Sequence, residues 1–169
     1  DALVIAAASV PDACNRLPDP RPFTKVGSLF DLSIVDVSVK ELTSIGANVL
    51  DRIRTKDARV SVDSGSVACG VLRRSVASTK SVISAEETTA MSGSIFGMAV
   101  DGDAVGSFVV DGIASRKRLG FVESLEKVAD RFVERTLGAL NPQKGESYKG
   151  AVLFSPEVVE SLLVGNLLA

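Results

Sequence analysis

Residues 58–115 leave little choice of secondary structure. Here β-branched residues, serines and glycines alternate in short runs such as RVSVDS, VACGVLRRSV, KSVIS and SGSIFGMAV, a pattern typical of half-buried strands. Asp101 and Gly102 stand between two apolar runs, and this dipeptide supplies the positive φ angles of a tight hairpin turn. The stretch is therefore predicted to form an antiparallel sheet, with paired strands on both sides of that turn.

Two amphipathic segments flank this stretch. The first is predicted to be a helix over about 38–54, because Ser38 followed by Glu41 makes a capping box. Its apolar residues recur at helical spacing: Val39, Leu42, Ile45, Val49 and Ile53. The second is predicted over about 122–137, with Gly138 as its C-cap. Its apolar face consists of Val122, Leu125, Val128, Ala129, Phe132, Val133 and Leu137. Segregated strands and helices indicate an α+β fold in which helices cover one face of an antiparallel sheet.

The two ends of the chain have a different character. Residues 2–10 predict the end of an apolar helix, and the four prolines from Pro11 to Pro22 predict an extended connector. At the other end GAVLFSPEVVESLLVGNLLA predicts a strand and then a helix that is capped by Ser155 and has Pro156 in its first turn. Its apolar stripe is expected to face the core of a further domain.

These features divide the chain into three expected parts. Residues 1–30 are the end of a first domain with its proline-rich connector, and residues 31–145 are a middle α+β domain. Residues 146–169 are the opening strand and helix of a truncated third domain. The middle domain is thus expected to be flanked by partial segments of its neighbours.

Composition excludes several classes of function. The 169 residues contain no histidine, so they cannot build a Ser-His-Asp or Cys-His nucleophile or a His-ligated zinc. A net charge of −2, from 19 Lys and Arg against 21 Asp and Glu, offers no bulk attraction for nucleic acid. No apolar run approaches the roughly 18 residues of a membrane span. Cys14 and Cys69 form no CxxC motif, which favours a reducing compartment.

Two acidic pairs and one basic run are candidates for chemistry. Asp101 and Asp103 could hold Mg²⁺ or Ca²⁺, but such cations need more oxygen ligands than one short loop supplies, so a polar hairpin tip is favoured. Glu86 and Glu87 are adjacent in a strand and point to opposite faces, which favours solvated charge over an acid–base pair. The Arg-Lys-Arg run at 116–118 could meet phosphates or an acidic partner, yet without interleaved aromatics a solvated connection is favoured.

The remaining candidates belong to no recognisable motif. Any catalysis by this chain would have to use carboxylates, lysines, Tyr148 or a cysteine. Cys69 lies in an alternating apolar run, where a buried and inert thiol is favoured over a nucleophile. Lys144, Gly145 and Lys149 lack the GxxxxGK[ST] order of a phosphate-binding loop. The residues alone therefore predict no catalytic, cofactor-binding or metal-binding position.

From Asp31 onward the order of segments resembles the TldD/PmbA family, often named modulators of DNA gyrase and associated with zinc-dependent proteolysis. DLSIVD resembles the entry into the family's middle domain, and SVISAEETTAMSGSIFGMAVDGD resembles its serine-rich paired strands. VADRFVERTLGAL is similar to the helix that follows them. YKGAVLFSPEVVESLL and ALVIAAASVPDACNRLPDP are similar to the start of the third domain and the end of the first. The family's Asn-Ser-x-Gly turn appears here only as ASTK, residues 77–80.

For the TldD branch the resemblance implies a helix with HExxxH after this strand, in which two histidines bind zinc and the glutamate activates water. Those positions fall near Val164, Gly165 and Ala169, none of which can bind a metal or transfer a proton. The resemblance is therefore to the PmbA branch, which implies a cytoplasmic, non-catalytic subunit without zinc of its own.

Such a subunit is expected to pair with a zinc-holding TldD-type partner, or with a second copy, and to act on peptides without binding nucleic acid or membrane. Two alternatives stay open. One is a self-contained interaction or scaffold domain, and the other is an enzyme that uses only carboxylates.

Overall fold

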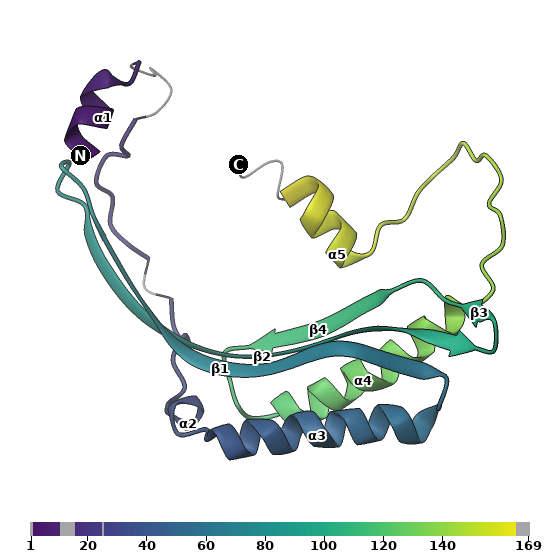
Figure 1. Ribbon diagram of the computed structural model, residues 1–169. Helices are drawn as coiled ribbons and strands as arrows, with labels where there is room; N and C mark the ends of the chain where they lie inside the picture. The colour runs from purple at the N-terminus through teal and green to yellow at the C-terminus, as the bar shows by residue number, and fades with distance from the viewer. Residues whose placement is uncertain (1, 11–15, 25, 165–169) are drawn as a thin grey trace.

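The computed structural model describes residues 2–10, 16–24 and 26–164, and Figure 1 shows their arrangement. The elements in chain order are α1 (Ala2–Ala8), α2 (Leu32–Val35), α3 (Val39–Lys56), β1 (Val60–Ala77), β2 (Ile83–Asp101), β3 (Ala104–Val105), β4 (Val109–Ser115), α4 (Phe121–Gly138), α5 (Pro156–Val159) and a π-helical turn, η1 (Glu160–Val164). The strands form one antiparallel sheet and α3 and α4 lie on one of its faces. The predicted α+β class is thus confirmed.

The sheet is built on one long hairpin. β1 pairs with residues 83–99 of β2, β4 pairs with residues 91–97 of β2, and β3 pairs with the last two residues of β2. The short runs expected from the sequence join into two strands of 18 and 19 residues. They join because the pairing register is continuous except for a bulge between Val62 and Ser64.

Past the end of β4, the hairpin continues as only two strands. We call this part, residues 71–90, the arm; it curves away from the helices (Figure 1). The connector lies against it, because Lys80 Nζ is 2.6 Å from Asp19 Oδ1 and the Thr89 N–H donates to the Leu29 carbonyl at 3.0 Å. The connector therefore covers part of the β2 edge of the arm.

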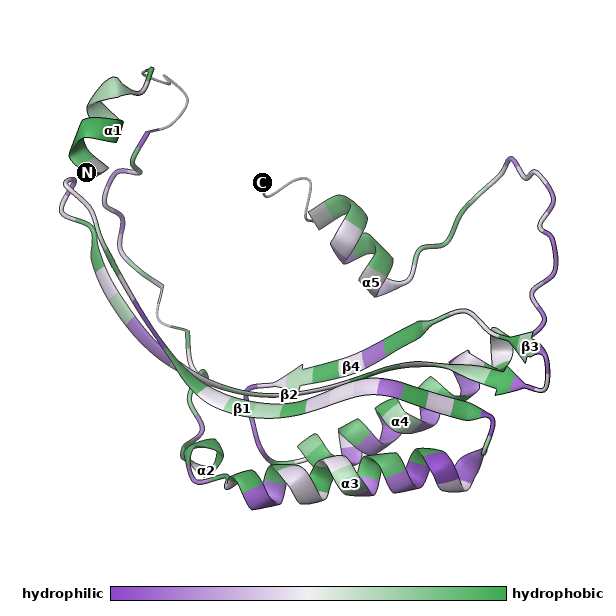
Figure 2. Cartoon of the chain, viewed as in Figure 1, coloured by the Kyte–Doolittle hydropathy of each residue, from purple (hydrophilic) through white to green (hydrophobic). Residues whose placement is uncertain are grey.

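The core lies between the sheet and the two long helices. Its buried members are Ile34, Ile45, Val49, Ile53, Val60, Met91, Ile95, Phe121, Leu125, Val128, Ala129, Phe132 and Val133. Burial of one side chain the size of Phe132 stabilises the fold by about 1.5–3 kcal/mol. In Figure 2, α3 and α4 alternate hydrophobic and hydrophilic residues, whereas α1 is hydrophobic on the side that is visible.

Both helices predicted to be amphipathic are confirmed, with differences in their first turns. Val39 is 79% exposed, because Ile34 of α2 fills the core at this end of α3. Val122 is 38% exposed, while Phe121 is buried. α4 starts at Phe121, four residues before Leu125, which places Phe121 on the same helical face one turn earlier.

The helix caps agree only in part with the expected ones. Ser38 Oγ accepts from the Glu41 N–H at 3.2 Å, as a capping box requires, but the Glu41 carboxylate binds Arg118 instead of completing the box. The C-cap of α4 is Ala139 with φ −88°, so Gly138 lies inside the helix and the prediction for it is wrong. The Ala139 N–H closes the last turn on the Arg135 carbonyl, which needs no left-handed residue.

Two local expectations are corrected as well. The central residues of the β2–β3 turn are Gly102 and Asp103, and of these only Gly102 has a positive φ, 58°. Asp101 instead pairs with Ala104 as part of the ladder. The strand predicted within 150–154 is not formed, because no described segment lies beside it to share a ladder.

Ion pairs join the two long helices on their solvent side. Arg52 of α3 donates to both carboxylate oxygens of Asp130 of α4, at 2.6 and 2.8 Å, and Lys56 Nζ lies 2.8 Å from Oδ1. The hydrogen bonds from Arg52 and then Lys56 hold the pKa of Asp130 well below its usual range. α3 and α4 are therefore held together by these ion pairs as well as by the apolar core.

One buried carboxylate joins α4 to the sheet. Asp111 of β4, whose side chain is 4% exposed, accepts from Arg131 at 2.6 and 2.7 Å and from Arg135 at 3.3 Å. Burial raises the pKa of Asp111, but the hydrogen bonds from Arg131 and the Gly112 N–H outweigh it, so the net shift is downward.

The same substitution is expected to have opposite effects at two glycines. An added Cβ at Gly97 would collide with the backbone carbonyl oxygen of Ser61, so Gly97→Ala should lower the free energy of unfolding by about 1–3 kcal/mol. An added Cβ at Gly46 of α3 would lie 3.8 Å from Val67 Cγ2, so Gly46→Ala should raise that free energy by up to about 1 kcal/mol. Urea unfolding measures the free energy of unfolding of both variants. An unchanged midpoint for Gly97→Ala would contradict the close contact between Gly97 and the Ser61 backbone.

Acid is expected to destabilise the fold partly through Asp111. A carboxyl whose pKa is lowered on folding contributes stability above its unfolded pKa and loses it as the pH falls through the folded value. Asp111→Asn should cost about 1–3 kcal/mol near neutral pH and should reduce the further loss below about pH 4. Asp103→Asn, at the exposed turn, is the matched control and should change neither. Urea midpoints measured near neutral pH and below about pH 4 test this. If Asp111→Asn loses as much stability in acid as the wild type does, the expectation is contradicted.

Candidate functional site

The helices leave one face of the sheet uncovered (Figure 1). Side chains alternate along the strands, so the residues that are not packed on the helices share this face. Most of them are small: Ser64, Ser66, Ala68, Ser92, Ser94, Gly112 and Ala114. Toward the end of β2 the ring of Phe96 stacks on that of Phe108, with centroids 4.9 Å apart. The open face is thus smooth and largely uncharged.

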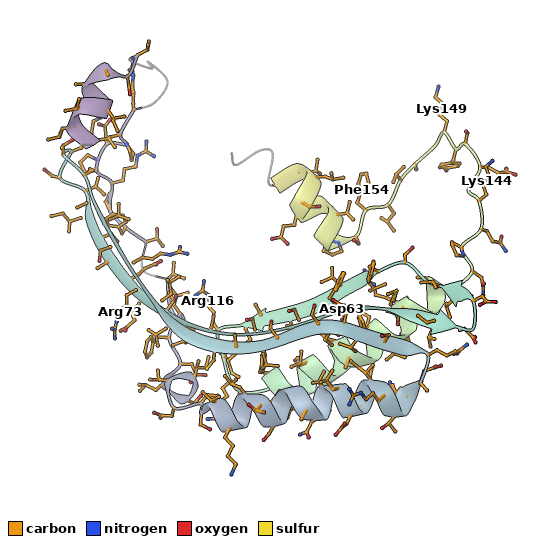
Figure 3. The ribbon with its side chains drawn as sticks, in the orientation of Figure 1. Asp63, Arg73, Arg116, Lys144, Lys149 and Phe154 are labelled. Atoms are coloured by element: carbon orange, nitrogen blue, oxygen red, sulfur yellow. The ribbon has the colours of Figure 1, made fainter. Side chains whose placement is uncertain are left out.

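Charges gather where this face meets the arm. A shallow depression there is lined by Leu72, Arg74, Glu86, Thr88, Ala90, Ala114, Ser115 and Arg116. Glu86 pairs with Arg74 at 4.0 Å, and Glu87 pairs with Arg73 at 2.6 Å. Figure 3 places Arg73 on the arm and Arg116 at its base. The two glutamates each face an arginine across the ladder, as solvated strand charge does.

A cavity lies between the sheet and the helices, near the bulge of β1. It has a volume of about 130 Å³ and is bounded by α3, β1, β2 and α4, with Gly46, Leu50, Val62, Gly65 and Leu125 among its lining residues. A groove that shares Leu50, Val62 and Gly65 continues from the cavity along the edge. The residue pattern alone does not predict this site, although an isolated glycine within a strand pattern is a known signal for a bulge.

Asp101 and Asp103 are not brought together with other metal ligands. Asp101 Oδ2 lies 3.0 Å from Arg59, which also binds Asp57 at 2.7 Å. The side-chain hydrogen bond from Arg59 lowers the pKa of Asp57 to about 2. Asp103 is exposed at the tip of the turn. Within the described residues, no three His, Cys, Asp or Glu side chains are grouped so that they could hold a metal ion.

Of the basic run at 116–118, Arg118 has a structural role. Its backbone N–H donates to Asp31 Oδ2 at 3.0 Å, and its guanidinium donates to the Ser33 carbonyl at 3.1 Å and to Glu41 at 2.6 Å. The Ser33 hydroxyl and then the Arg118 N–H lower the pKa of Asp31. Arg118 thereby ties the start of α2 to the β4–α4 connection, and Arg116 stays exposed.

The other candidates that the structure describes lie apart from one another. Cys69 is a half-buried free thiol that packs against the core, and Cys14 lies outside the described residues. Lys144, Gly145 and Lys149 lie in an exposed segment without helix or strand, which Figure 3 shows as a loop away from the sheet.

The positions aligned with the family's zinc motif lie at the end of the chain. Val164 is the last residue of the π-helical turn, whereas Gly165 and Ala169 lie outside the described residues. Across the part of the chain that the structure describes, no helix combines the length and the apolar character that a bilayer crossing needs.

Two solved structures share the architecture described above. TldE from Thermococcus kodakarensis matches 80% of this chain with a TM-score of 0.63 and 20% sequence identity. A "putative modulator of a DNA gyrase" from Thermotoga maritima matches 78% of it with a TM-score of 0.60 and 15% identity. In both, the match covers 30% of the other protein. No protein-family model and no curated protein matches the sequence.

These similarities agree with the TldD/PmbA resemblance of the sequence. At 20% and 15% identity they establish architecture and not activity. The chain thus has the fold of one part of TldE and of the Thermotoga protein, a curved antiparallel hairpin sheet with two helices packed on one face.

Proposed function

We propose that this chain is part of a PmbA-like member of the TldD/PmbA family. It would act as a cytoplasmic, non-catalytic subunit of a zinc metalloprotease complex that cleaves peptides or unfolded proteins. The observation that carries the proposal is the shared fold with TldE, found for a chain whose segments already resemble this family. Activity, substrate and partner are properties of a whole protein, and this chain spans 30% of the length of TldE.

The residues present do not fit a zinc centre of the TldD type. Such a centre needs two histidines and a glutamate, and the sequence has no histidine at any position. Val164, Gly165 and Ala169, which take the three places, have neither a ligand atom nor a titratable group in their side chains. Zinc and the activated water would therefore come from a TldD-type partner, and no chemical step is assigned to this chain.

The contribution of this chain to such a complex would be a wall for the reaction chamber or part of the dimer interface. The open face of the sheet is smooth and nearly uncharged, and exposed strand edges offer unpaired N–H and C=O groups to extended peptides. Both features suit the handling of unfolded chains without selection for one sequence.

A self-contained interaction domain is the second candidate. It is favoured by the closed core of the middle domain, which draws on α2, α3, β1, β2 and α4. Neither α1 nor α5 contacts this core in the described part of the chain. A thermal melt distinguishes the two: cooperative unfolding of a monomer favours this candidate, and aggregation or dimerisation through apolar ends favours the proposed subunit.

Zinc content and peptide cleavage test the proposed subunit. The full-length protein alone should bind far less than one equivalent of zinc and should cleave no peptide. Mixed with a TldD-type partner it should form a complex that contains zinc and cleaves unfolded peptides, and a chelator should abolish the cleavage. Stoichiometric zinc on this protein alone would contradict the proposal. So would an equal rate of cleavage by the partner with and without this protein.

A further inference from the structure

We propose that the bulged outer edge of β1 is a binding site for a short, uncharged, extended peptide. The site, here the edge site, consists of residues 61–67 of β1 with Gly46, Leu50 and Arg54 of α3. The peptide would add to the sheet as a strand and place one aliphatic side chain in the neighbouring cavity. This deepens the proposed function and rests on its handling of extended peptides, because it names the edge and the kind of peptide. Its binding test is separate from the zinc and cleavage test, so either can fail alone.

The backbone of this edge is available for pairing. Within the described residues β1 pairs only with β2, so its other edge has no strand beside it. The sequence from 61 to 70, SVDSGSVACG, contains one charged residue and no proline. Edges that natural proteins protect from pairing usually carry lysines, several charges or proline. This edge has none of these protections apart from Asp63 and the bulge.

The cavity provides a place for one side chain. Its volume is about 130 Å³, close to the roughly 150 Å³ of a cavity that accepts benzene. Its walls are mainly aliphatic, from Val49, Leu50, Val67 and Ile95, and it opens toward the groove at Val62 and Gly65. A Val, Leu or Ile side chain therefore matches it in size and polarity. Main-chain bonds with a pocket for one side chain are the general pattern of strand addition.

The bulge favours a short peptide over a second copy of this chain. Between Val62 and Ser64 the regular spacing of the edge is interrupted, so a long regular strand such as another β1 would lose its register there. A short strand needs only the few residues beside the cavity. The bulge thus limits open-ended pairing and leaves a local site.

The charges at the mouth of the site indicate an uncharged ligand. Arg54 and Asp63 both line the groove, and Figure 3 shows Asp63 on the part of β1 that lies over the helices. Both side chains are exposed, and among the described residues neither takes part in an ion pair or hydrogen bond. Their opposite signs leave the mouth without net charge, so it attracts neither acidic nor basic peptides in particular.

Peptide binding to the full chain tests the edge site. The probe is a capped, fluorescein-labelled peptide of alternating threonine and serine with one central leucine, and its binding is followed by fluorescence anisotropy. Replacement of the central leucine by serine should weaken binding about tenfold or more, since the burial of one aliphatic side chain is lost. N-methylation of the alternate backbone nitrogens that point toward β1 should abolish binding, because it removes the N–H donors of the ladder. Equal affinity for the leucine, serine and N-methylated peptides would overturn the proposal.

A pair of variants tests the cavity. Gly46→Leu should fill it and weaken binding of the leucine peptide about tenfold or more. Gly138→Leu, at an exposed position of α4 outside the edge site, is the matched control and should leave the affinity close to that of the wild type. Circular dichroism checks that both variants fold, and the peptide series tests the proposal without any variant. Unchanged binding in a folded Gly46→Leu would overturn it. If no peptide binds, and sedimentation shows that Gly46→Leu dissociates a dimer, the proposal is overturned in favour of a second copy at this edge.

Discussion

The packing of α3 and α4 on one face of the sheet is the interaction on which the other features depend. Phe121, Leu125 and Phe132 of α4 are 1%, 1% and 0% exposed, against a sheet whose glycines let the helix approach closely. An added Cβ at Gly93 would lie 2.6 Å from Leu125 Cδ1. Because strand side chains alternate between faces, this single-sided contact also decides which residues of β1, β2 and β4 face away from the core.

Two of the charged residues that were candidates for chemistry have structural roles. Arg118 ties the start of α2 to the β4–α4 connection, and Asp101 shares Arg59 with Asp57. Asp111, by contrast, belongs to no motif in the sequence, yet its buried carboxylate binds Arg131 and Arg135. Partners of this kind lie far apart in sequence, so the fold must be known before a charge can be given a role.

Elements were predictable where local physics is sufficient. Helical spacing of apolar residues located α3 and α4 to within two residues of their ends, and strand alternation with the glycine turn located the sheet. Errors arose where tertiary contacts decide. Val39 and Val122 are exposed because Ile34 and Phe121 take the core positions, and residues 150–154 form no strand because no ladder partner is described beside them. The edge site was not predictable, since its cavity is bounded by four elements and a bulge.

By itself the sequence determined the α+β class, the two amphipathic helices and the exclusion of histidine chemistry within these residues. Periodicity and composition are local properties, and they need no knowledge of what lies nearby in space. Only the tertiary structure decided the joining of short runs into a long curved hairpin, the choice of the covered face and the position of the cavity beside β1. Register, burial and cavities result from contacts between residues far apart in the chain, which no local pattern specifies.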